Sequence, residues 1–233
     1  PYHGAAYAVV EAAAKVVAAG ARYERMRYSY QEYFERMTRN PESWGKPLGA
    51  LLGALKMQVE LGLPSIGGKD SMSGTFQDIN VPPMLMAFGI TTVDASKVIS
   101  TDLKGAGHRI YLVRHTPLEN RMPDTAQLKE NFAFVSGRIE SGKILSAWSV
   151  GFGGVGEGLA KMAFGNGIGA EVTEVTVGEQ ADFTQFDLFF IGGGQDFEQE
   201  VLLSDLKAGK GSEIKAAIAD GKTFLTICGG YQM

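Results

Sequence analysis

Cysteine, histidine and long apolar runs are all scarce in this chain. Its 233 residues include one Cys and three His, so an internal disulfide is excluded and nothing points to an oxidising compartment. No segment reaches the roughly 18 apolar residues of a membrane span, and no signal peptide is recognisable, so we predict a cytoplasmic protein without membrane contact. Basic residues are also few, since 22 Lys and Arg face 26 Asp and Glu. This balance argues against a nucleic-acid partner, because phosphate binding needs a basic surface.

Glycine, in contrast, is abundant. The chain contains 31 Gly, nearly twice the usual share of about 7 %. Many of them are clustered, at Gly67–Gly68, Gly153–Gly154, Gly192–Gly194 and Gly229–Gly230. Because adjacent glycines let the backbone approach a ligand closely, we expect these clusters to mark functional segments.

Apolar patterns predict a mixture of α/β and α+β structure over the first 169 residues. Helices are expected over 4–20, 48–61, 124–139 and 153–164, with a loop over 40–47. Strands are expected over 84–93, 108–114 and 144–152, and a strand followed by a short helix within 22–37. Asp124 or Thr125 is suited to cap the third helix.

The pattern changes near residue 170, where we place a domain boundary between residues 1–169 and 170–233. Short apolar strands are expected over 187–191 and 223–227, with helices over 197–206 and 213–220 between them. Strands that alternate with helices in this way are typical of a parallel, doubly wound sheet. The second segment is therefore predicted to be an α/β unit.

Residues 65–76 place a glycine pair beside a charged dipeptide, in the order Ser-Ile-Gly-Gly-Lys-Asp-Ser-Met-Ser-Gly-Thr-Phe. Backbone N–H groups at the glycines can approach an anion, and Lys69 adds a cation beside them. Asp70 is suited to Mg²⁺, and Ser71 or Ser73 to a phosphate oxygen. The spacing of a P-loop is absent. The pattern alone also allows a glycine-rich turn between two strands with a solvated Lys–Asp pair.

This stretch strongly resembles the phosphoribosylformylglycinamidine synthase family of the purine pathway, in particular its long single-chain form. The resemblance covers residues 1 to about 168 almost continuously. It includes Pro1–Ala6, Tyr30–Phe34, Trp44–Pro47, Val81–Pro83, Pro123–Phe132 and Val150–Ile168.

The resemblance implies part of the second synthetase half, a partial domain similar to aminoimidazole ribonucleotide synthetase. Such an enzyme uses ATP, Mg²⁺ and glutamine-derived ammonia to convert formylglycinamide ribonucleotide to the amidine. It also implies a site for ATP or ADP that is contacted by Gly67, Gly68, Lys69, Asp70 and Ser71. Asp94 is a weaker candidate for the metal. Many relatives carry Asp-Gly-Gly where this chain has Phe152-Gly153-Gly154, which favours a degenerate or structural nucleotide site.

The only cysteine, Cys228, follows a predicted buried strand and precedes Gly229–Gly230. This arrangement has the form of a nucleophile elbow, in which a following helix lowers the pKa of the thiol. Backbone N–H groups at Gly192–Gly194, after the neighbouring strand, are placed to stabilise an oxyanion. A structural Cys in a core strand is the alternative.

Two runs in this segment, 187–194 and 225–232, resemble class I glutamine amidotransferases of the cobyric-acid-synthase type. The likeness is greatest to the glutaminase subunit of lipid II isoglutaminyl synthase. It implies that Cys228 attacks the amide of glutamine and releases ammonia, that Gly193 contributes to the oxyanion hole, and that Gln232 binds glutamine. The activating His of this class follows the nucleophile, whereas His3, His108 and His115 all precede Cys228. We therefore expect a truncated segment without glutaminase activity of its own.

Taken together, the two segments predict a fragment of an ATP-dependent, glutamine-using, amidine-forming ligase that lacks its other synthetase half or a partner subunit. One alternative is a glutaminase-subunit fragment for lipid II amidation, and another is a non-catalytic nucleotide-binding module. The change of family near residue 170 indicates a join between unrelated genes. Whether that join is a natural fusion or an artefact stays open, as does the oligomeric state.

Overall fold

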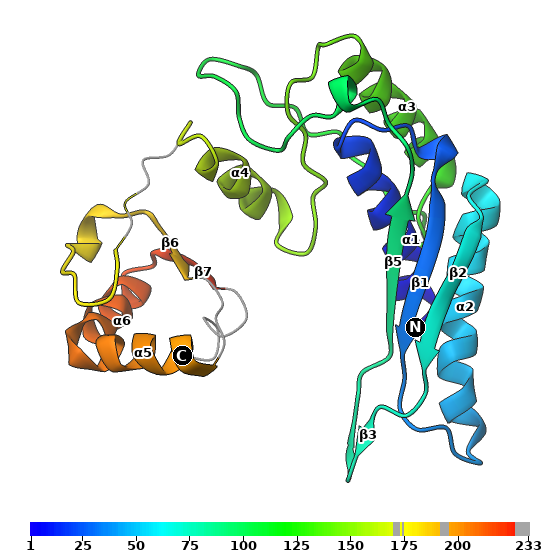
Figure 1. The fold of residues 1–233 in the computed structure, drawn as a ribbon, viewed down its shortest axis with the longest axis horizontal. Helices are drawn as coiled ribbons and strands as arrows, with labels where there is room; N and C mark the ends of the chain where they lie inside the picture. The colour runs from blue at the N-terminus through cyan, green and yellow to red at the C-terminus, as the bar shows by residue number, and fades with distance from the viewer. Residues whose placement is uncertain (170–172, 174, 192–195, 227–233) are drawn as a thin grey trace. The chain divides into compact units, whose positions relative to one another are not determined.

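The structure is a computed structural model that describes residues 1–169, 173, 175–191 and 196–226. The chain divides into two compact units, Pro1–Ala170 and Glu171–Met233, each with its own helices and strands (Figure 1). Both units mix α and β structure, as the sequence predicts. Among the described helices, none combines the length and the apolar character that crossing a bilayer requires.

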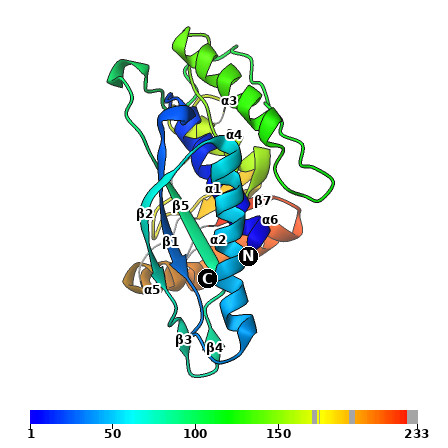
Figure 2. The same ribbon diagram turned by 90° about the vertical axis from the view of Figure 1, so that its right-hand side faces the viewer.

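Unit 1 is built on a three-stranded sheet in the order β2-β1-β5. Its central strand, β1, runs parallel to β2 and antiparallel to β5. Two long helices, α1 and α2, lie on the same side of this sheet (Figures 1 and 2). The bounds of these elements are α1 Tyr2–Ala18, β1 Arg27–Tyr33, α2 Pro41–Leu61, β2 Ser65–Ser71 and β5 Met84–Ile90.

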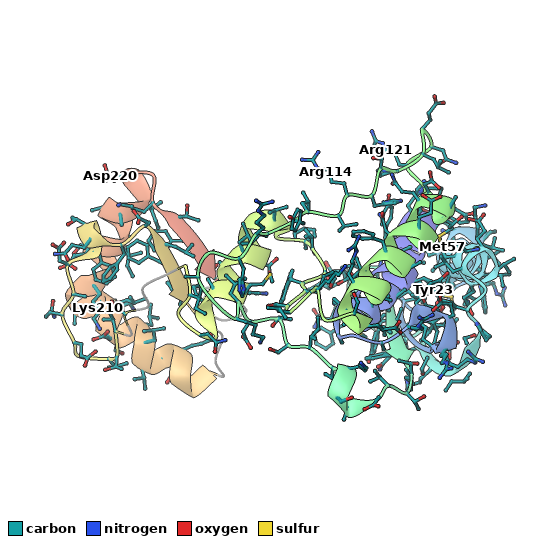
Figure 3. The ribbon with its side chains drawn as sticks, turned by 90° about the horizontal axis from the view of Figure 1, so that it is seen from above. Tyr23, Met57, Arg114, Arg121, Lys210 and Asp220 are labelled. Atoms are coloured by element: carbon teal, nitrogen blue, oxygen red, sulfur yellow. The ribbon has the colours of Figure 1, made fainter. Side chains whose placement is uncertain are left out.

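The core of unit 1 lies between the helices and the covered face of the sheet. Small Ala and Val side chains on α1 allow α2 to approach closely, and Met57 of α2 and Tyr23 lie within this core (Figure 3). Tyr28 is fully buried, and its hydroxyl donates a hydrogen bond of 2.8 Å to the carbonyl oxygen of Val9. This bond ties β1 to α1, since an unpaired buried hydroxyl is costly.

The remaining elements of unit 1 lie outside the three-stranded sheet. They are η1 Tyr23–Arg25, β3 Thr75–Phe76, β4 Ile79–Asn80, η2 Ala95–Lys97, α3 Thr125–Glu140 and α4 Gly154–Phe164. Leu128 and Phe132 of α3 belong to the core. The predicted cap of α3 is confirmed, because the Asp124 carboxylate accepts hydrogen bonds from the backbone N–H groups of Ala126 and Gln127. An N-cap of this kind satisfies donors that the first helical turn leaves unpaired.

Several sequence predictions for unit 1 are wrong. The predicted strands 108–114 and 144–152 are irregular, and residues 34–37 form no helix after β1. Ile110 and Tyr111 are exposed, so their apolar pattern does not mark a buried strand. The predicted loop 40–47 mostly belongs to α2, which begins at Pro41 with Asn40 as its cap. Pro is favoured at the first position of a helix because its fixed φ suits the helix and its missing N–H is not needed there.

Unit 2 contains a pair of parallel strands, β6 and β7, joined by a helical connection. This arrangement agrees with the predicted parallel α/β unit. The elements are η3 Phe183–Gln185, β6 Leu188–Ile191, α5 Asp196–Asp205, the π-helix η4 Leu206–Lys210, α6 Gly211–Ala219 and β7 Thr223–Thr226. The ring of Phe189 stacks on that of Phe224 across the two strands, with 4.4 Å between the ring centroids.

Candidate functional site

The predicted nucleotide-binding stretch is an edge strand of the unit 1 sheet, not a turn. Residues Ser65–Ser71 form β2, whose residues are exposed up to Asp70. Gly68 pairs with Tyr30 of β1, and a Cβ added at Gly68 would lie 2.6 Å from the carbonyl oxygen of Tyr30. A Cβ at Gly67 would meet nothing within 4 Å. The absence of a side chain at Gly68 therefore allows β1 and β2 to approach closely.

The strand geometry divides the predicted contact residues between two faces of the sheet. Lys69 pairs with Gln31, whereas Asp70 pairs with Glu32. Since successive side chains of a strand point to opposite faces, Lys69 lies on one face and Asp70 on the other. Glu32 is buried, which assigns Asp70 to the side that α1 and α2 cover. The five predicted residues thus do not form a single contact surface.

Lys69 lies on the open face of the sheet. Its side chain is exposed, and its ammonium donates to the main-chain carbonyl oxygen of Asp70 at 3.2 Å. Across the part of the chain that the structure describes, no carboxylate lies within ion-pair distance of it. An exposed, unpaired ammonium beside backbone that is free of side chains is suited to a phosphate.

A shallow hollow begins two residues after β2. Its volume is about 470 Å³, and it is lined by the strands β3 and β4 and their flanks, Ser73, Gly74, Thr75, Phe76, Ile79, Asn80, Val81 and Pro82. The Phe76 ring is 72 % exposed. An exposed ring next to a hydroxyl and a glycine offers a stacking surface with nearby polar groups.

Glu32 is a buried carboxylate that the sequence analysis missed. It is 5 % exposed, and its Oε1 has no hydrogen-bond partner in the described structure. Burial raises the pKa of Glu32, and the neighbouring Asp70 carboxylate raises it further. Its even spacing from the core residues Tyr28 and Tyr30 along β1 was the available signal, because it assigns all three to one face.

This raised pKa predicts a pH-dependent stability. Between the ordinary pKa of Glu, about 4.3, and its raised value, the unfolded chain loses the proton first. The free energy of unfolding of unit 1 is therefore higher at low pH, and this extra stability is lost as the pH rises through that range. Glu32→Gln should raise the free energy of unfolding by about 1 kcal/mol at pH 8, since a neutral amide is cheaper to bury, and change little at pH 4.

Urea denaturation followed by the fluorescence of Trp44 and Trp148, both in unit 1, measures this effect. Glu130→Gln, which removes an exposed carboxylate from α3, is the matched control. It should leave the free energy of unfolding unchanged at both pH 8 and pH 4. Equal effects of Glu32→Gln at both pH values would contradict the assignment.

The weaker metal candidate, Asp94, is engaged in capping. Its Oδ1 accepts hydrogen bonds of 2.9 Å from the backbone N–H and the hydroxyl of Ser96, and these bonds lower its pKa. Within the described residues, no group of three or more His, Cys, Asp or Glu side chains is placed to hold a metal ion. A metal role for Asp94 stays a prediction.

The Phe152-Gly153-Gly154 segment lies at the start of α4. Phe152 is fully exposed, and the backbone N–H of Gly153 donates to the Glu157 carboxylate at 2.9 Å. A hydrogen bond from Lys161 is the main cause that lowers the pKa of Glu157. The backbone N–H of Gly153 is therefore already hydrogen-bonded to a side chain of the same helix.

In unit 2, the described strands precede, in the sequence, both parts of the predicted glutaminase site. Because β6 and β7 are parallel and Ile191 pairs with Thr226, they end at the same edge of the sheet. The candidate residues Cys228, Gly193 and Gln232, and the whole of Gly192–Gly194, lie outside the described residues.

All three histidines belong to unit 1. His3 contacts the carbonyl oxygen of Asn120 through Nε2 at 3.0 Å. The Nε2 of His115 accepts a hydrogen bond from the backbone N–H of Asp124 at 2.9 Å, and burial lowers the pKa of this imidazole. His115 is thus engaged in holding the start of α3.

Comparison with known proteins finds two kinds of relative. Residues 168–233 match the family of CobB/CobQ-like glutamine amidotransferase domains. The fold is similar to that of Thermotoga maritima PurL complexed with ATP, with a TM-score of 0.50 and 17 % identity over 72 % of this chain and 27 % of that one.

Two groups of curated relatives match different shares of the chain. The subunit GatD of lipid II isoglutaminyl synthase from Staphylococcus aureus is 43 % identical over 74 residues, which cover 32 % of this chain and 30 % of GatD. The phosphoribosylformylglycinamidine synthase subunit PurL from Pyrobaculum islandicum is 25 % identical over 207 residues, which cover 82 % of this chain and 28 % of PurL. Both resemblances are confirmed, and the chain spans less than a third of the length of each relative.

Proposed function

We propose that unit 1 binds the phosphates of ATP or ADP through the open face of β2, as part of an amidine-forming, glutamine-using ligase of purine biosynthesis. The observation that carries this proposal is the exposed ammonium of Lys69, which lies on the same face as Gly67 and Ser71 and has no carboxylate partner among the described residues. An open hollow begins at Ser73, two residues after Ser71. The likeness of the fold to a PurL complexed with ATP supports it.

The alternating geometry of β2 refines this proposal. Gly67, Lys69 and Ser71 share the open face and are assigned to the nucleotide, whereas Gly68 serves the pairing of β1 and β2. Asp70 lies on the other face, at the edge of the sheet. Mg²⁺ commonly takes one or two carboxylates together with substrate phosphates, so a metal ligand role for Asp70 requires a nucleotide that reaches around this edge.

Calorimetric titration of the chain with ADP, with and without Mg²⁺, tests the proposal. Lys69→Ala should weaken binding by about 10- to 100-fold, the loss expected for a hydrogen bond between charged groups. Lys129→Ala removes an exposed ammonium from α3 and should leave the affinity unchanged. Absence of ADP binding by the unaltered chain, or an equal effect of the two substitutions, would refute the nucleotide site.

A second candidate function belongs to unit 2, which resembles the glutaminase subunit for lipid II. Support comes from the parallel pair β6 and β7, whose last residues, Ile191 and Thr226, pair at one edge of a sheet. In the sequence these strands precede Gly192–Gly194 and Cys228, respectively. The glutaminase function has a requirement that nucleotide binding does not have, because hydrolysis of glutamine needs a base that activates the thiol of Cys228. His3 and His115 both hold main-chain groups within unit 1.

We therefore expect the chain alone to release no ammonia from glutamine above the rate of its Cys228→Ala variant. A coupled assay with glutamate dehydrogenase measures this release. Glutamine-dependent ammonia that disappears in Cys228→Ala would overturn this expectation and favour the glutaminase function.

A further inference from the structure

Helix α2 carries two separate apolar faces, of which only one is used within unit 1. The buried face packs against α1 and consists of Ser43, Pro47, Ala50, Gly53, Ala54, Met57 and Leu61. The second face is formed by Trp44, Leu48, Leu51, Leu52, Leu55 and Val59, whose exposed fractions lie between 48 % and 72 %. We call these six residues the outer stripe.

The outer stripe is a continuous surface. At about 100° per residue, its six positions fall within an arc of roughly 100°, between the buried face and a polar sector that contains Glu42, Lys56 and Glu60. Large apolar side chains that gather on one exposed face of a helix mark a contact with another molecule more often than a solvated surface. The indole of Trp44 is held in place, since its Nε1 donates to the carbonyl oxygen of Thr38 at 2.9 Å.

The spacing of the stripe is symmetric about its centre, between Leu51 and Leu52. When a second α2 is laid antiparallel on the first, Leu51 faces Leu52. In the same register Leu48 faces Leu55, and Trp44 faces Val59. Every apolar side chain then meets an apolar side chain of the other copy, as the self-complementary contact of a twofold dimer requires.

The exposed area is sufficient for such a contact. The six side chains are 48 % to 72 % exposed, so full coverage of the stripe in two copies would bury at most about 1,200 Å², close to the roughly 1,000 Å² that a specific interface needs. Lys56, the charged residue of α2 that adjoins the stripe around the helix, is already paired with Glu60, so it brings no isolated ammonium to the interface. From the symmetry, the area and the paired charge we infer that two copies of this chain associate through antiparallel α2 helices.

Sedimentation velocity across a range of protein concentrations tests this dimer. We expect a monomer–dimer equilibrium whose dissociation constant rises at least about 100-fold in the double variant Leu48→Glu and Leu55→Glu, since four carboxylates would then lie in an apolar contact. Phe134→Glu places the same charge at an exposed apolar position of α3 and should leave the constant unchanged. Circular dichroism verifies that each variant is folded.

Disulfide formation tests the register. In a Cys228→Ser background, Leu52→Cys lies next to the twofold axis and should form a disulfide-linked dimer on mild oxidation. Val59→Cys faces Trp44 of the other copy and should not. A chain that stays monomeric at all concentrations, a dimer that the double variant leaves intact, or crosslinking through Val59→Cys instead of Leu52→Cys would each overturn the antiparallel dimer.

Discussion

Gly53→Ala is expected to lower the free energy of unfolding of unit 1 by about 3 kcal/mol, the upper range for overpacking a core. Gly53 lies on the buried face of α2, where a Cβ would overlap the main-chain carbonyl of Tyr2 in α1. The obstacle is backbone, so no side-chain rotation relieves it. The helices must separate, which also opens the packing around Ala50 and Met57.

Gly45→Ala is the matched control in the same helix. Nothing lies within 4 Å of a Cβ at this position, and Gly45 is exposed. Alanine is the better helix former, so this variant should gain about 0.5 to 1 kcal/mol. Urea denaturation followed by circular dichroism compares the two, and changes of equal size or sign would contradict the assigned approach of α1 and α2.

Lys210→Met should have a comparably large effect on unit 2. The ammonium of Lys210 donates to the Asp205 carboxylate at 2.7 Å and to the carbonyl oxygen of Thr176 at 2.6 Å. Both side chains of the ion pair are at least nine-tenths buried. The other carboxylate oxygen of Asp205 accepts from the backbone N–H of Gly178, and the hydrogen bond from Lys210 is the main cause that lowers the pKa of Asp205.

Removal of the ammonium leaves a buried carboxylate and a carbonyl group without their partner. We expect amide hydrogens of α5 and α6 to exchange roughly 100-fold faster in Lys210→Met, because breaking one side of a buried ion pair is far costlier than losing an exposed one. Lys207→Met, at an exposed position of the same π-helix, should exchange like the unaltered chain. Equal protection in both variants would show that the buried pair contributes little.

The parts of the fold that follow local rules were predictable. The helix over Tyr2–Ala18 follows from a run of strong helix formers, and the start of α3 follows from the side chain of Asp124. The parallel pair β6 and β7 follows from short apolar runs separated by helical segments. These features depend on neighbours within a few residues, which a single sequence contains in full.

The strand β2 was not predictable in this way. Ser65–Ser71 has two glycines and two charges, a composition that is typical of a turn, and it becomes a strand only because β1 offers a parallel partner. The irregular segment His108–Arg114 is the reverse case. Its residues have strand-forming side chains, but exposure of Ile110 and Tyr111 shows that their apolar pattern does not serve a buried sheet.

The amino-acid sequence by itself determined that this chain joins two segments, one similar to PurL and one to glutamine amidotransferases, because those resemblances depend on the order of residues. Only the tertiary structure decided which side chains share a surface. It placed Lys69 and Asp70 on opposite faces of one strand, brought Glu32 beside Asp70, and left the outer stripe of α2 uncovered. The physical reason is that the pairing of strands and the packing of helices act between residues far apart in the chain, where local patterns carry no information.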